Sequence, residues 1–226
     1  MSKVKTFEGK CTESIKDLPI KFSYELDDFQ KFAYLAIQRN DNVLCLVPTG
    51  AGKSTVATLQ VYKTILEGKK SVYLSPIKAL SNEKYRDFKE IFLKNPIKDN
   101  NNDNKYITVG LLTGDNKINP DADCLVMTTE ILCNALYRIK NNNTVSDTTN
   151  KQLDDNFVSN IGSVIIDESH YIADESRGVV YEETFVMLDP SIQLVLLSAT
   201  ISGANSFAQW LVDIKNKDIS LIQSFT

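Results

Sequence analysis

The chain has 226 residues, of which 42% are apolar and 24% are charged, and this composition supports one domain with a full hydrophobic core. Its formal net charge is −4, so no overall basic field attracts the domain to nucleic acid, and any such contact must be local. The four cysteines lack C-x-x-C spacing and His170 is the single histidine, which argues against a zinc site and for reduced thiols.

The N-terminal segment contains no apolar signal region, and no apolar run approaches the length that spans a membrane. We therefore expect an intracellular protein, in the cytoplasm or the nucleus, that does not contact a membrane.

Predicted helices and strands alternate along the chain. Helices follow from apolar residues at intervals of three and four, and strands follow from short apolar runs. In chain order they are a helix at 27–40, a strand at 43–47, a helix at 53–66, a strand at 71–74, a helix at 80–92, strands at 107–112 and 124–127, a helix at 129–139, and strands at 163–166 and 194–197. This alternation predicts an α/β fold with a mostly parallel, doubly wound sheet, helices on both faces, and sites at the carboxyl ends of the strands.

Two polar segments interrupt the alternation. Residues 98–105 and 141–156 are rich in Asn, Asp, Thr and Lys, and they contain too few apolar side chains to pack. We expect flexible surface insertions at both places, with a contact to a partner as the alternative. Residues 1–22 are expected to form an N-terminal extension of the single domain.

The segment Val47–Thr55 reads Val-Pro-Thr-Gly-Ala-Gly-Lys-Ser-Thr and joins a predicted strand to a predicted helix. This arrangement forms a cradle for nucleotide phosphates, because glycines let successive N–H groups point at one anion beside a helix N-terminus. Lys53 is expected to reach the β- and γ-phosphates, and the Ser54 hydroxyl to bind Mg²⁺. The predicted nucleotide contacts here are Pro48, Thr49, Gly50, Ala51, Gly52, Lys53, Ser54 and Thr55.

A second motif, Asp167-Glu168-Ser169-His170, directly follows the strand at 163–166. An acidic residue that ends a strand beside a phosphate cradle is suited to orient Mg²⁺, and we assign this role to Asp167. Glu168 is expected to act as the general base on the attacking water. His170 is expected to connect hydrolysis to the Ser198-Ala199-Thr200 segment through hydrogen bonds, and Ser198 and Thr200 are the predicted coupling residues.

These motifs, in this order and spacing, resemble those of the first RecA-like domain of superfamily 2 helicases. Four further segments narrow the resemblance to the superkiller-type DExH RNA helicases, which feed RNA to the exosome: 75–88, 112–115, 126–132 and 177–183. The resemblance covers residues 24–211. Asn82, Ser169 and Tyr181 depart from it, since Gln, Val or Ile, and Trp are usual at these positions.

The resemblance implies further roles. Tyr24 and Gln30 look like the adenine-recognition element of an ATP site, although Gln30 also fits a solvated helix position. The residues that match RNA-backbone contacts are Pro76, Lys78, Asn82, Thr113, Gly114, Asp115, Thr128, Thr129 and Glu130. Strand ends and helix N-termini offer donors to phosphates there, so these contacts leave base sequence unread.

In this family, ATP and Mg²⁺ lie between two RecA-like domains, and the second domain supplies arginine fingers. The resemblance therefore implies that residues 1–226 form the N-terminal RecA-like domain of a helicase that unwinds RNA from 3′ to 5′. No motif of the second domain is present in the sequence, so the isolated chain is expected to be monomeric and nearly inactive. The expected partners are RNA, the second RecA-like domain and the RNA-decay machinery. The alternatives are a DNA helicase of the same superfamily and a binding module without catalysis.

Overall fold

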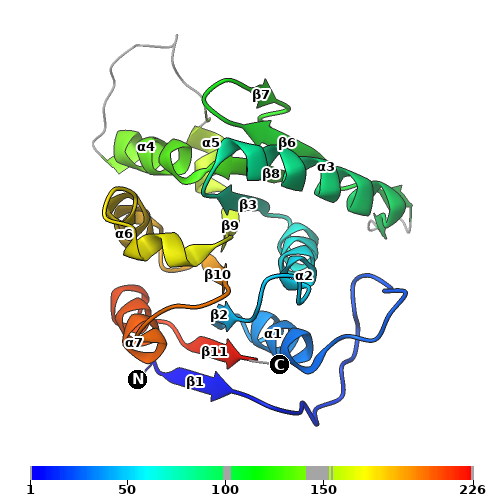
Figure 1. Ribbon diagram of the computed structural model, residues 1–226. Helices are drawn as coiled ribbons and strands as arrows, with labels where there is room; N and C mark the ends of the chain where they lie inside the picture. Colours follow the sequence, from blue (N-terminus) through cyan, green and yellow to red (C-terminus); the bar gives the residue numbers. More distant parts are fainter. Residues whose placement is uncertain (1, 99–102, 141–152, 154, 225–226) are drawn as a thin grey trace.

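The computed structural model describes residues 2–98, 103–140, 153 and 155–224. Its centre is a nine-stranded sheet in which every neighbouring pair is parallel except β6 and β7 (Figure 1). In spatial order the strands are β1 (Val4–Phe7), β11 (Ile219–Gln223), β2 (Asn42–Leu46), β10 (Gln193–Ser198), β9 (Ile161–Ile166), β3 (Lys70–Ser75), β8 (Cys124–Thr128), β6 (Val109–Leu112) and β7 (Lys117–Ile118).

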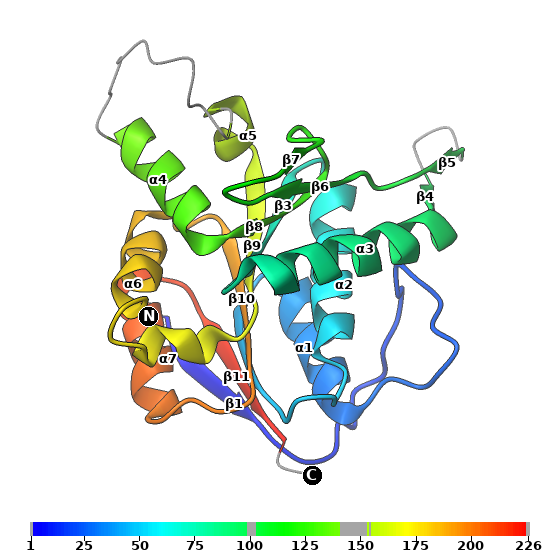
Figure 2. The same cartoon turned by 45° about the horizontal axis from the view of Figure 1, so that its top comes forward.

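Helices cover both faces of this sheet (Figure 2). One face carries α1 (Asp28–Gln38), α2 (Lys53–Leu66) and α3 (Lys78–Lys94), and the other carries α4 (Thr129–Lys140), α5 (Asp155–Ser159), α6 (Gly178–Met187) and α7 (Ala204–Lys215). A short 3-10 helix, η1 (Ser169–Ala173), follows β9. The fold class predicted from the sequence is confirmed.

Strand β2 illustrates how the sequence builds two cores. Its side chains alternate, so that Val43 and Cys45 join the core under α1 to α3, while Leu44 and Leu46 join the core under α4 to α7. All five of its residues are buried. A central parallel strand therefore reads as an unbroken apolar run instead of an alternating one.

Several elements differ from the sequence-based expectation. Residues 4–7, expected within an N-terminal extension, form the edge strand β1, which pairs with β11. The described ends of the expected insertion at 98–105 form part of a small antiparallel hairpin, β4 (Ile97–Lys98) with β5 (Asn104–Lys105). Most of the second expected insertion lies outside the described residues, although α5 begins within it and places Phe157 in the core. No helix among the described residues has the length and apolar character needed to cross a membrane.

The parallel register fixes where the motifs meet. The carboxyl ends of β2, β10 and β9 are neighbours, and they lead into residues 47–55, 198–200 and 167–170. The ends of β3, β8 and β6 continue the same edge and lead into the segments beginning at Ser75, Thr128 and Thr113. Motifs far apart in sequence therefore form one continuous edge.

Candidate functional site

The glycine-rich turn between β2 and α2 adopts a conformation that depends on its glycines. Gly50 and Gly52 have φ values of +84° and +91°, in the left-handed region that side chains disfavour. A Cβ atom on Gly52 would also lie 2.8 Å from Nε2 of Gln30. The turn ends at Lys53, the first residue of α2, where the N–H groups of the helix N-terminus favour an anion.

Lys53 is buried at the base of the turn. Its Nζ donates hydrogen bonds to the carbonyl oxygens of Val47 at 3.1 Å and Pro48 at 3.3 Å. Both acceptors are neutral carbonyl oxygens of the turn itself. The side chain is thus positioned to exchange these acceptors for phosphate oxygens.

Asp167 and Glu168 follow β9 directly. The Asp167 carboxylate is buried, accepts a hydrogen bond from the Glu168 N–H at 3.0 Å through Oδ1, and accepts another from the Tyr73 hydroxyl through Oδ2. Burial raises the pKa of Tyr73 well above its usual value, and the negative charge of Asp167 adds to this shift. Tyr73 is therefore a protonated donor at neutral pH, and it fixes the orientation of Asp167.

His170 connects the acidic motif to the next strand. Its Nδ1 lies 3.3 Å from Oε2 of Glu168 and 3.3 Å from Oγ of Ser198. The Ser198 hydroxyl is also 3.2 Å from the Thr200 carbonyl oxygen. Glu168 itself has a left-handed backbone, with φ and ψ both +47°, which is uncommon for a residue with a side chain. The structure thus brings together Glu168, His170, Ser198 and Thr200, as the spacing predicts.

The oxygen groups at this edge fit a magnesium ion that is shared with phosphates. Ser54 supplies a hydroxyl and Asp167 a buried carboxylate, and hard oxygen ligands of this kind suit Mg²⁺. Within the described ranges, no three His, Cys, Asp or Glu side chains cluster closely enough to hold a metal ion by themselves. Mg²⁺ sites that use one or two protein ligands plus substrate phosphates have this composition.

The predicted adenine-recognition residues contact the glycine-rich turn. Tyr24 is 53% exposed, and its Oη lies 2.7 Å from Oγ1 of Thr55. Gln30 is 2% exposed; its Oε1 accepts from the Asp27 N–H at 3.0 Å, and its Nε2 donates to the Gly52 carbonyl at 3.1 Å. Both ends of the Gln30 amide are therefore engaged by the chain, and its contact with adenine stays a prediction.

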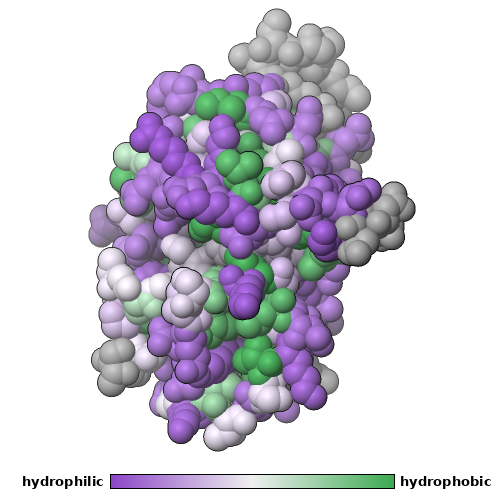
Figure 3. Space-filling view, turned by 90° about the vertical axis from the view of Figure 1, so that its right-hand side faces the viewer, coloured by the Kyte–Doolittle hydropathy of each residue, from purple (hydrophilic) through white to green (hydrophobic). Residues whose placement is uncertain are grey.

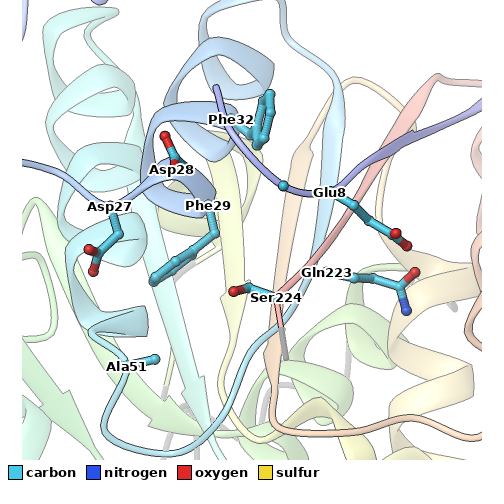
Figure 4. A pocket seen from close by; sticks show the side chains of 9 residues that line it. Glu8, Asp27, Asp28, Phe29, Phe32, Ala51, Gln223 and Ser224 are labelled. Atoms are coloured by element: carbon cyan, nitrogen blue, oxygen red, sulfur yellow. The ribbon is translucent and has the colours of Figure 1, made fainter. Parts of the chain in front are cut away.

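A cavity of about 540 Å³ borders the same turn (Figure 4). Its lining includes Phe29 from the start of α1, Ala51 from the turn and Ser224 beyond β11, and Figure 4 shows the Phe29 ring above Ala51, with Ser224 to its right. Neither Tyr24 nor Gln30 lines it. A second hollow of about 410 Å³ is lined mainly by apolar residues of the segment 15–26, together with Lys21, Glu25 and Lys31, on the side of the molecule where Figure 3 shows apolar surface between hydrophilic side chains.

The predicted RNA contacts from β3 and β6 meet at the same edge. Nζ of Lys78 lies 2.6 Å from Oδ2 of Asp115, and Gly114 leaves room for the Lys78 side chain. Asn82 donates from Nδ2 to the Lys78 carbonyl at 2.9 Å, while the buried Thr113 accepts from the Asn116 N–H at 3.1 Å. A single ion pair thus joins two segments that are 37 residues apart.

The other predicted RNA contacts lie beside this pair. Thr128 and Thr129 are buried where β8 passes into α4, and Glu130 is exposed in the first helical turn. The carbonyl of Pro76 accepts a hydrogen bond from Nη1 of Arg177 at 3.2 Å. Arg177 also lies over the Tyr171 ring, with 5.2 Å between its Cζ and the ring centroid, so it connects η1 to the end of β3.

Sequence reasoning missed Lys84, which contacts the site directly. Its Nζ donates to Oγ of Ser54 at 2.9 Å, across the boundary between α3 and α2. Lys84 comes three residues after Ser81 and four before Phe88, both of which are buried on the inner side of α3. This helical spacing could have indicated the contact from the sequence, because it places Lys84 on the side of α3 that packs on the domain.

Comparisons with known proteins agree with this geometry. Residues 27–207 match the DEAD/DEAH box helicase family. The chain is 39% identical to the antiviral helicase SKI2 of Saccharomyces cerevisiae over 222 residues, covering 98% of this chain and 15% of that protein. It is also 39% identical to the DExH-box ATP-dependent RNA helicase DExH11 of Arabidopsis thaliana over 207 residues, covering 92% of this chain and 13% of that protein.

The fold also matches a solved helicase. The crystal structure of the DUF1998 helicase MrfA bound to DNA and AMPPNP superposes with a TM-score of 0.65 at 18% identity, covering 87% of this chain and 26% of that one. At this identity the likeness concerns the fold alone. The chain spans less than a fifth of the length of the curated relatives above. Family match, relatives and fold together show that this chain belongs to the DEAD/DEAH box helicases and that its relatives are the superkiller-type DExH RNA helicases.

Proposed function

We propose that this chain is the N-terminal RecA-like motor domain of an ATP-dependent DExH-box RNA helicase. The observation that carries the proposal is the shared edge of the sheet. The glycine-rich turn at 47–55 (the phosphate turn), the acidic motif at 167–170 and the coupling segment at 198–200 follow three adjacent strands. The predicted RNA segments follow the next three strands. A nucleotide and a nucleic-acid backbone that bind to these segments would therefore lie on neighbouring strands of one sheet.

Each group has a defined task in this function. Lys53 would bind the β- and γ-phosphates, while Ser54 and Asp167 would hold Mg²⁺, which neutralises phosphate charge. Glu168 would accept the proton of the attacking water, and His170 would relay the state of Glu168 to Ser198 through the shared Nδ1 contact.

The RNA substrate is a proposal that rests on the relatives, whereas the 3′ to 5′ direction and a role in RNA decay are proposals that rest on the resemblance to the superkiller-type helicases. Two relatives bear the names antiviral helicase and ATP-dependent RNA helicase. A DNA helicase of the same superfamily is the competing function. A binding competition between an RNA and a DNA of the same sequence distinguishes the RNA helicase from the DNA helicase. Preferential binding of the DNA would contradict the RNA assignment.

We expect slow ATP hydrolysis by the 226-residue chain alone, since an arginine finger contributes roughly 10³–10⁵-fold to phosphoryl transfer. Three of its four arginines are engaged away from the phosphate turn, with Asp41, Pro76 and Asp155. The remaining one, Arg86, is exposed on α3. Turnover at the rate of a complete helicase would contradict this expectation.

Binding and hydrolysis by two variants test the nucleotide site. Lys53→Ala should abolish binding of a fluorescent ATP analogue with Mg²⁺, because it removes the cation that faces the phosphates. In a longer chain that also contains the second RecA-like domain, Glu168→Gln should keep binding and lower the single-turnover hydrolysis rate by about 10²–10⁴-fold. Lys89→Ala, which changes charge equally on the exposed side of α3, is the matched control and should behave as the unaltered chain. Unchanged hydrolysis in Glu168→Gln would remove Glu168 from the role of general base.

A further inference from the structure

We propose that Lys84 sets the Mg²⁺ affinity of the phosphate site by competing with the metal for the hydroxyl of Ser54. This inference rests on the proposed function, in which the turn at 47–55 binds a nucleotide together with Mg²⁺. Lys84 would act as a positioning residue, through Ser54, and would not itself take part in the chemistry.

The geometry places Lys84 between two acceptors. Its Nζ lies 2.9 Å from Oγ of Ser54 on α2 and 3.6 Å from Oδ2 of Asp87, one helical turn further along α3. The Lys84 side chain is 17% exposed, so it is largely screened from solvent by the two helices. A short movement of one ammonium group would therefore exchange a neutral acceptor for a charged one.

The chemistry of Ser54 makes the two cations compete. A hydroxyl oxygen has two lone pairs, but an ammonium group and a divalent cation on one oxygen repel each other strongly where water is scarce. Binding of Mg²⁺ by Ser54 would thus require Lys84 to leave. Asp87 already lies beside the departing ammonium group and offers it a stronger, charge-assisted hydrogen bond.

The exchange of Lys84 between Ser54 and Asp87 would also change how α3 is held against α2. Helix α3 begins at Lys78, where the predicted RNA contacts lie, and α2 begins at the phosphate turn. The contact between Lys84 and Ser54 links these two helices across 30 residues of sequence. Displacement by the metal would release α3 from the phosphate site at the moment when Mg²⁺ is bound.

A double-mutant cycle on the 226-residue chain tests the proposal. Affinity for a fluorescent ADP analogue is measured in EDTA and across a Mg²⁺ titration. Lys84→Ala should raise the apparent Mg²⁺ affinity about five-fold or more, as coupled sites typically do, and leave binding in EDTA unchanged. Asp87→Asn should lower the apparent Mg²⁺ affinity, because Lys84 loses its alternative acceptor. In the Lys84→Ala background the same change should have no effect, and Lys89→Ala should match the unaltered chain.

Three results would overturn the role of Lys84 while leaving the proposed function intact. If Lys84→Ala weakened nucleotide binding equally with and without Mg²⁺, Lys84 would be a phosphate contact. If the effects of Lys84→Ala and Asp87→Asn were additive, general electrostatics would account for both. If the unaltered chain bound the analogue and Lys84→Ala kept the same Mg²⁺ dependence, competition at Ser54 would be absent. Failure of the unaltered chain to bind any nucleotide would instead contradict the proposed function itself.

Discussion

Ser169 is a buried polar residue in the middle of the acidic motif. Its side chain is fully buried, and its Oγ has no hydrogen-bond partner among the residues that the structure describes. The superkiller-type pattern has Val or Ile at this position. A buried hydroxyl that loses water without gaining a partner costs free energy, so Ser169 should weaken the fold next to the carboxylates of Asp167 and Glu168.

We predict that Ser169→Ala raises the free energy of unfolding by about 1 kcal/mol, because it removes the desolvation cost of the hydroxyl. Urea unfolding measures the change. Ser220→Ala is a matched control of opposite sign, since Ser220 is equally buried but donates to Oδ2 of Asp41 at 3.0 Å. A loss of stability in Ser169→Ala as large as in Ser220→Ala would show that Ser169 has a partner.

The positions of residues within contiguous motifs could be predicted from the sequence, because local spacing alone places them at one strand end, while their roles stay predictions. Lys53, Ser54 and Asp167 belong to this group. Tyr73 and Lys84 do not, since their partners Asp167 and Ser54 lie 94 and 30 residues away. Only the order of strands in the sheet and the docking of α3 on α2 bring these pairs together.

At the scale of elements, most buried strands were predictable, but the buried strand β11 and the edge strand β1 were not predicted. Strand β1 is an edge strand that is only partly buried, so its four residues show no continuous apolar run. Helix α6 carries apolar residues on both sides: Val179 and Val186 are 57% exposed, whereas Tyr181 and Phe185 are buried. An apolar pattern without one dominant face gives no helical signal.

Helix α7 contains a charged residue that should make stability depend on pH. Lys215 is buried near its C-terminus, and its Nζ donates to the Leu188 carbonyl at 2.5 Å. Burial lowers the pKa of Lys215 from 10.5 to about 8, which the nearby charge of Lys140 reinforces. Between these two values the unfolded chain binds a proton that the folded chain lacks. The free energy of unfolding attributable to Lys215 therefore rises as the pH increases from about 8 to 10.5.

We predict that Lys215→Met removes this rise, which amounts to roughly 2–3 kcal/mol across the interval. Denaturant unfolding of both proteins at several alkaline pH values gives the difference, in which the titration of other groups cancels. Lys89→Met, at an exposed position, should keep the pH dependence of the unaltered chain. Parallel curves for Lys215→Met and the unaltered chain would show that Lys215 titrates normally when folded.

At the scale of the whole molecule, charge decides how RNA would bind. The net charge of −4 opposes association with phosphates, so affinity must come from local donors at the edge of the sheet. Lys78 is the cationic side chain among the predicted contacts, and Asp115 partly neutralises it. With 54% and 74% of the two side chains exposed, the pair is weak and can exchange its partner for a phosphate.

We predict that Lys78→Ala and Asp115→Asn change the salt dependence of RNA binding in opposite directions. Each phosphate contact on a single strand contributes about 0.7 to the slope of log affinity against log salt. Lys78→Ala should flatten the slope by about that amount and weaken binding equally for poly-A, poly-U and mixed RNA, because a phosphate contact leaves the bases unread. Asp115→Asn should tighten binding and steepen the slope. In the unaltered chain, Asp115 loses Lys78 when Lys78 binds a phosphate, and the freed carboxylate takes up a cation from solution; the asparagine side chain would not do so. Fluorescence anisotropy across a salt series measures both. A changed preference among the three RNAs with an unchanged slope would show that Lys78 reads bases instead of phosphates.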